Sequence, residues 1–198
     1  MVNGDAIMNL AQDGTLTIDG SYSTAGVDYA EFFESTDGNA IAVGSSVILE
    51  NGKVKLCPEG ETPLGVVRPN TSSSTIGGEH LFSWQGKYLK DDYDSYQTET
   101  ANFYSWKVDG ETLQYYEDEM PEGVTPPEDA QLSVQTRKIL NPAFDVALEE
   151  GYVSRQDRPE WNVIGLLGQI PITKGQPTAA TWIKMKDISA TVEMWFVK

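Results

Sequence analysis

The chain has 198 residues, 39% of them hydrophobic, which is enough for one domain of moderate size or for a domain with an arm. Thirty acidic residues against fourteen basic ones give a formal net charge of −16, so nucleic acid and anionic membrane surfaces are not expected partners. A mean hydropathy of −0.37 and the absence of a long apolar run exclude membrane insertion through a transmembrane helix, and the N-terminal residues do not form a secretory signal.

The single cysteine and the single histidine limit the chemistry that the chain can carry out. An intrachain disulfide cannot form, and a zinc site of the usual cysteine and histidine type is not available. Cys57 lies near the end of a predicted strand and is expected to fill space in the core. His80 lies in a stretch rich in Gly and Ser that predicts a loop, and a catalytic triad would have to use it. The chemistry is therefore expected to rely on carboxylates, hydroxyls or lysines, with no metal and no cofactor.

The predicted elements begin with a short N-terminal arm, residues 1–26, which resembles a fibre stalk. Within it, "DGTLTIDG" is an alternating strand between two Asp-Gly turns. The strand is too short to be stable alone, so it must pair with another segment. Residues 27–198 form the body.

The clearest local prediction in the body is a β-hairpin with the turn Asn51-Gly52. Apolar residues rich in β-branched side chains precede this turn, and residues 53–56 alternate between polar and apolar after it. This pattern is typical of two strands joined by a type I′ turn. The stretch "TPLGVVRP" then predicts a short buried strand that Pro69 ends.

The middle of the body, residues 86–127, is rich in aromatic and acidic side chains. It predicts a meander of short strands with a second turn at Asp109-Gly110, followed by a Pro- and Glu-rich connector at residues 120–129. Further strands follow up to the C-terminus, and no long helix is required. The predicted fold class is therefore mainly β, a compact barrel or sandwich of short antiparallel strands.

One acidic motif stands out in "STAGVDYAEFFES", where carboxylates alternate with aromatic residues. Asp28, Glu31 and Glu34 are each three residues apart, a spacing that would place them on one face of a helical turn beside an aromatic wall. Two carboxylates with separated pKa values can hydrolyse a peptide bond, because one activates water and the other protonates the leaving amine. The alternative is structural: the carboxylates would bind backbone amides or the cations of a neighbouring chain.

Several separated motifs, in order along the chain, resemble one known family. The motifs are "AGVDYAEFFESTDGN", "PLGVV", "WQGKYLKDDYDSY", "RKILNPAFD", "SRQDRPEW", "VIGLLGQIPITKGQP" and "WIKMKDISATVEMWFVK". Together they are similar to the C-terminal autoproteolytic, intramolecular-chaperone domain of bacteriophage neck-appendage, tail-fibre and tailspike proteins, the peptidase G2 type. The resemblance covers nearly everything from Ala25 to Lys198.

This resemblance implies a homotrimer in which the domain helps three chains find register. It also implies an autoproteolytic endopeptidase that acts once on itself, with the scissile bond between Val27 and Asp28. Asp28 and Glu31 would be the catalytic acids, and Glu34 a support residue. The expected partners are other copies of the chain and other phage virion proteins, and the expected location is the virion, assembled in the host cytoplasm.

Three functions stay open at this point. With Met1 taken as the start, little chain precedes the motif, so a structural trimer in a virion fibre or appendage is preferred. The second is an active self-cleaving chaperone domain that assembles such a fibre. The third is a carbohydrate-binding tip, in which aromatic residues such as Trp84, Trp106 and Tyr115 would bind a host-surface glycan.

Overall fold

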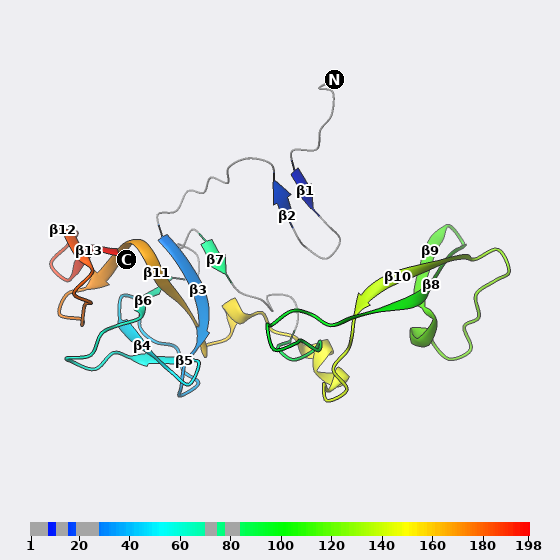
Figure 1. Ribbon diagram of the computed structural model, residues 1–198, viewed down its shortest axis with the longest axis horizontal. Coiled ribbons are helices and arrows are strands. Elements are labelled where there is room, and N and C mark those ends of the chain that lie inside the picture. Colours follow the sequence, from blue (N-terminus) through cyan, green and yellow to red (C-terminus); the bar gives the residue numbers. More distant parts are fainter. Residues whose placement is uncertain (1–7, 11–15, 19–27, 70–74, 78–83) are drawn as a thin grey trace, which may run out of the picture. The chain divides into compact units, whose positions relative to one another are not determined.

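The computed structural model describes residues 8–10, 16–18, 28–69, 75–77 and 84–198 (Figure 1). These residues are mainly in antiparallel strands, which confirms the predicted fold class. The helices among them are short 3-10 helices. In this part of the chain, no helix has the length and apolar content that crossing a membrane would require.

Contacts divide the chain into two compact units, one formed by Met1–Leu81 with Val153–Lys198 and the other by Phe82–Tyr152. Each unit contains its own sheets. The elements of the first unit are β1 (Met8–Leu10), β2 (Leu16–Ile18), β3 (Asp28–Glu34), β4 (Ser46–Glu50), β5 (Lys53–Leu56), β6 (Gly65–Arg68), β7 (Thr75–Gly77), η3 (Arg155–Asp157), β11 (Trp161–Thr173), β12 (Ile183–Asp187) and β13 (Val192–Val197).

A small antiparallel hairpin lies in the predicted N-terminal arm. β1 pairs with β2, with Met8 opposite Ile18 and Leu10 opposite Leu16. The strand predicted in "DGTLTIDG" is therefore present over Leu16–Ile18, and β1 is the partner that it needs. The rest of the predicted arm lies outside the described residues.

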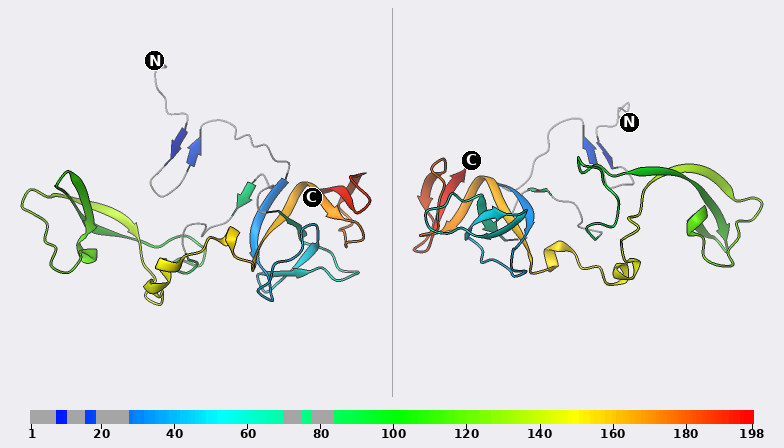
Figure 2. Two further views of the ribbon diagram at one scale, coloured as in Figure 1. Left: turned by 180° about the vertical axis from the view of Figure 1, so that it is seen from behind. Right: turned by 60° about the horizontal axis from the view of Figure 1, so that its bottom comes forward.

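The main sheet of the first unit has eight strands, and the long strand β11 pairs with three of them (Figures 1 and 2). β3 pairs along one edge of β11, while β6 and then β13 pair along the other. The ladder continues from β6 to β4 and β5, and from β13 to β12. Between Ser35, which directly follows β3, and Val54 of β5 there is an isolated bridge and no continuous ladder, so the sheet does not close. Of the two predicted forms, the barrel is therefore wrong.

The predicted first hairpin is formed by β4 and β5. Asn51 and Gly52 have φ values of 51° and 81°, and the positive φ at both positions confirms the type I′ turn. Cys57 follows β5 directly and is buried, as predicted for a residue that fills space in the core. Burial raises the pKa of its thiol.

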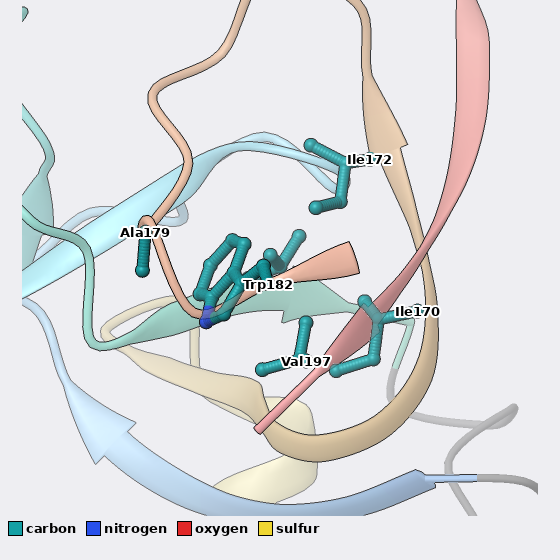
Figure 3. Close-up of a cluster of buried hydrophobic side chains, with 6 residues drawn as sticks. Ile170, Ile172, Ala179, Trp182 and Val197 are labelled. Atoms are coloured by element: carbon teal, nitrogen blue, oxygen red, sulfur yellow. The ribbon is translucent and has the colours of Figure 1, made fainter. Parts of the chain in front are cut away.

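Two hydrophobic clusters share strand β6. Val66 belongs to one cluster and Val67 to the other, because successive side chains of a strand point to opposite faces. A strand buried on both faces carries a continuous apolar run, which explains why this segment shows no alternation. The first cluster contains Val66, Ile170, Ile172, Ala179, Trp182 and Val197 (Figure 3). The second contains Val47, Val54, Val67 and Ile164.

The second unit is built on a three-stranded antiparallel sheet in the order β10-β8-β9. Asp109 and Gly110 form the predicted turn between β8 and β9, with φ values of 52° and 88°. The predicted connector at residues 120–129 contains no strand. The elements of this unit are β8 (Thr98–Val108), β9 (Glu111–Tyr116), η1 (Glu117–Glu119), β10 (Gln131–Lys138) and η2 (Val146–Gly151).

Aromatic and charged contacts hold the strands of this second sheet together. The rings of Phe103 and Tyr116 lie 5.0 Å apart, and the Arg137 guanidinium lies 4.6 Å from the Tyr116 ring. Arg137 also forms an ion pair with Asp118 in η1, the 3-10 helix that follows β9. Their hydrogen bonds raise the pKa of Arg137 and lower that of Asp118. Glu99 and Glu119 lie 2.8 and 3.0 Å from the same guanidinium.

Candidate functional site

The acidic motif forms strand β3, so the prediction that its three carboxylates share one face of a helical turn is wrong. The aromatic residues of the motif favour a strand, and β11 supplies a ladder that runs from Asp28 opposite Gly168 to Glu34 opposite Trp161. Residues three apart in a strand point to opposite faces. Asp28 and Glu31 therefore lie on opposite faces of β3.

The Asp28 carboxylate is buried and forms an ion pair with Arg68. The distance from Arg68 Nε to Asp28 Oδ2 is 2.8 Å, and the two side chains are 8% and 0% exposed, respectively. Arg68 is the last residue of β6. β6 pairs with one edge of β11, and β3 pairs with the other edge. The ion pair therefore links β6 to β3 across β11, the strand that lies between them. Since a buried charge without a partner is strongly destabilising, each of these two residues depends on the other.

Gly165 of β11 leaves the space that the Arg68 side chain occupies between β6 and β3. Gly165 lies opposite Ala30 on one neighbouring strand and Val66 on the other. A Cβ at this position would lie 3.0 Å from Cγ and 3.2 Å from Cδ of Arg68, which is tighter than ordinary contact. Sequence reasoning missed both Arg68 and Gly165. The available signal was the cation that ends the apolar run "GVVR", because a cation there needs a partner once the strand is buried.

Glu31 and Glu34 have other partners. The hydroxyl of Tyr29, two residues away on the same face, donates a hydrogen bond to Glu31, and this bond raises the pKa of Tyr29. Lys53 Nζ lies 2.6 Å from Glu34 Oε1, where both side chains are partly exposed. The strand thus presents three carboxylates in three different settings: buried with a cation, beside a phenol, and in an ion pair near the surface.

Two residues singled out in the sequence, Val27 and His80, lie outside the described residues. Of the two residues that form the predicted scissile bond, Asp28 is among the described residues and Val27 is not. Among the residues that the structure describes, no three His, Cys, Asp or Glu side chains gather in a way that could hold a metal ion.

The aromatic residues considered for glycan binding lie in the second unit. Trp106 is 8% exposed and packs 5.7 Å from the ring of Tyr115, so it offers little surface for stacking on a sugar. Trp84 is half-buried, contacts Tyr152 edge to face, and donates its indole N–H to the carbonyl oxygen of Leu148. These contacts are typical of aromatic residues that stabilise a fold.

The antiparallel fold and the buried ion pair at the start of β3 define a class of β-rich domain in which an acidic motif strand is built into the core. The Peptidase_G2 family, described as the IMC autoproteolytic cleavage domain, matches residues 3–194. The chain belongs to this family, which confirms the predicted resemblance.

Relatives in the family include pre-neck appendage proteins of bacteriophages. The chain is 35% identical over 145 residues to the pre-neck appendage protein of Bacillus phage B103, an alignment that covers 73% of this chain and 13% of that protein. It is 32% identical over 145 residues to the pre-neck appendage protein of Bacillus phage phi29, covering 73% of this chain and 14% of the relative. The chain therefore spans a small part of the length of these relatives.

Two solved structures share the fold. The pre-mature bacteriophage phi29 gene product 12 superposes with a TM-score of 0.67 at 24% identity, covering 96% of this chain and 24% of that one. The C-terminal fragment of the same gene product superposes with a TM-score of 0.56 at 27% identity, covering 86% of this chain and all of the fragment (100%). The fold is thus that of a C-terminal region of a longer phage protein.

Proposed function

We propose that the chain is a trimer-forming chaperone domain of a bacteriophage virion appendage, such as a tail fibre, tailspike or neck appendage. Membership of the family over residues 3–194 and the pre-neck appendage relatives support this function. Its partners would be two further copies of the chain and other virion proteins, and its location the virion, after assembly in the host cytoplasm.

The observation that carries the structural role is the buried ion pair between Asp28 and Arg68. It links Asp28, the first residue of the motif strand β3, to Arg68 of β6 across the strand β11. A chain that leads from a fibre into this domain would be anchored at that residue. The motif therefore has a role in the fold whether or not it also acts in catalysis.

Light scattering at micromolar concentration tests the trimer. The expected mass is about three times the 21.8 kDa of one chain. Since each chain carries a net charge of −16, the measurement belongs at physiological salt, where repulsion between exposed charges is screened. A mass of one chain under these conditions would contradict the trimer.

A second candidate function is self-cleavage before Asp28, which the autoproteolytic description of the family supports. Hydrolysis would add the hydroxyl of a water molecule to the carbonyl carbon of Val27 and a proton to the nitrogen of Asp28, and would break the bond between those two atoms. Because Asp28 and Glu31 lie on opposite faces of β3, we assign them separate roles. Asp28 is a fixed carboxylate next to the leaving nitrogen, and Glu31 accepts the proton from water.

Intact-mass measurements on folded protein test the cleavage. The wild-type chain is expected to yield a product that begins with Asp28, whereas Glu31→Gln keeps full mass as a folded trimer. Asp28→Asn is also expected to keep full mass. It is measured at a temperature where it is folded, because it leaves the buried Arg68 without its charged partner. Val27→Gly is expected to be cut faster, since the attacked carbonyl loses its branched neighbour. Asp37→Asn is a matched control, because Asp37 is an exposed carboxylate just beyond β3. If the wild-type and Val27→Gly chains both stay intact for days, self-cleavage is excluded and the structural role alone remains.

A further inference from the structure

We propose that Arg68 is a positioning residue for the bond between residues 27 and 28, an inference that rests on the self-cleavage proposed above. Arg68 contacts Asp28, and it would act on the reaction through that residue. The placement of Gly165 beneath the Arg68 side chain makes the contact sterically feasible.

The geometry fixes the residue that carries the leaving group. The nitrogen that leaves in hydrolysis is the backbone nitrogen of Asp28. The backbone of this residue is held by its pairing with Gly168 on β11, and its carboxylate is held at 2.8 Å by Arg68 Nε. Both side chains are almost fully buried, so neither can change rotamer without displacing its neighbours.

The Arg68 side chain is itself held in place. Its aliphatic part crosses Gly165 at a distance where a single added carbon atom would be too close. Its guanidinium is planar, and its donors have a fixed arrangement, so its direction determines the direction of the carboxylate that it binds. Arg68 acts through its contact with Asp28 and transfers no proton itself. The proton that reaches the leaving nitrogen originates from the water that adds to the carbonyl carbon.

Positioning and stability can be separated by experiment. Removing one partner of a buried ion pair destabilises a fold, so slower cutting in Arg68→Met alone would not establish positioning. Val163→Ala is a matched control, because Val163 lies opposite Arg68 in the β11–β6 ladder and is fully buried in a cluster with Ala30 and Phe32. This substitution loosens the same part of the sheet and leaves the ion pair in place. Arg68→Lys keeps the charge but not the planar group.

The experiment measures the cutting rate by intact mass and the unfolding midpoint of every variant, at a temperature where each is folded. Misplacement of a reacting group by about 1 Å reduces a rate by about 100-fold. Arg68→Met is therefore expected to cut about 10- to 100-fold more slowly than wild type, with partial rescue in Arg68→Lys. Val163→Ala is expected to cut within about twofold of wild type despite its lower midpoint.

Each outcome decides the proposal. Wild-type cutting with an unchanged rate in folded Arg68→Met overturns positioning by Arg68 and leaves self-cleavage standing. A rate in Val163→Ala that falls as far as in Arg68→Met shows a structural role alone and also overturns it. A wild-type chain that never cuts removes self-cleavage and this inference together. Should Arg68→Met fail to fold, the comparison of Arg68→Lys with Val163→Ala decides: similar rates overturn the proposal, and a slower Arg68→Lys supports it.

Discussion

In the first unit, the inner strand β6 is buried on both faces between two hydrophobic clusters, whereas in the second unit aromatic and charged side chains of the sheet contact one another. Among the described residues, the buried hydrophobic side chains lie in the first unit, with Trp106 as the exception. In the second unit, Leu132 and Val134 on β10 are 57% and 69% exposed. Similar antiparallel pairing is thus stabilised by a core in one case and by cross-strand contacts in the other. Regions with few buried contacts open at lower free energy, so the second unit is expected to open locally before the first unfolds.

The largest expected effect comes from emptying the core of the first unit. Trp182→Ala removes a buried ring from the cluster with Ile170 and Val197 (Figure 3). It is expected to lower the free energy of unfolding by about 3–5 kcal/mol, measured by chemical denaturation. The matched change in the second unit is Trp106→Ala. An equal loss of global stability in that variant would show that the two units unfold together, and it would contradict the expectation that the second unit opens before the first.

Arg137→Met is expected to act on the second unit alone. The hydrogen bond with Arg137 lowers the pKa of Asp118, so the stabilisation from this carboxylate is present above about pH 4 and is lost as the pH falls below that value. NMR signals of β8 and β10 should therefore shift with acid in the wild-type protein, and this response should be reduced in Arg137→Met. An unchanged acid response in the variant would contradict the role of this ion pair.

Two matched glycine substitutions give a smaller effect and compare the units directly. Gly52 and Gly110 both have positive φ, 81° and 88°, and an added Cβ would meet no atom within 4 Å at either. Each change to Ala is therefore expected to be unfavourable by about 1–2 kcal/mol through backbone conformation alone. For Gly52→Ala the loss should appear in global unfolding, and for Gly110→Ala as faster hydrogen exchange in β8 and β9. A global loss in both would contradict separate stabilities.

The smallest effect is expected at the exposed face of β10. Val134→Ser should change the free energy of unfolding by less than about 0.5 kcal/mol, because the side chain is already in contact with water. The proposed trimer, if light scattering finds it, supplies the control. If the change lowers stability by more in the trimer than in a dilute monomer, another chain covers this face.

The two hairpin turns and the class of fold could be predicted because their determinants are local. Asn51-Gly52 and Asp109-Gly110 each place residues that tolerate positive φ at the two central positions, and both turns form as expected. Apolar runs such as that of β6 indicated buried strands for the same reason. Nothing beyond the nearest neighbours is needed for these predictions.

The site depended on strand order, which local pattern does not contain. The spacing of Asp28 and Glu31 fits a helical turn equally well until β11 is known to pair with this segment. Arg68 reaches Asp28 because β11 lies between β6 and β3 and because its residue at the crossing is Gly165. β3, β6 and β11 are far apart in the sequence, so their meeting at this site follows only from the strand order of the sheet.

Because β11 lies between β3 and β6, its late position in the chain determines when the buried ion pair can form during synthesis. Its partners β3 and β6 lie near the start of the chain, so both are synthesised well before residues 161–173. At about 5–20 residues per second, translation leaves these two strands for several seconds without the strand that joins them. Asp28 and Arg68 therefore cannot reach their buried arrangement over Gly165 until that residue has left the ribosome. The motif strand is locked in place late, when most of the domain already exists.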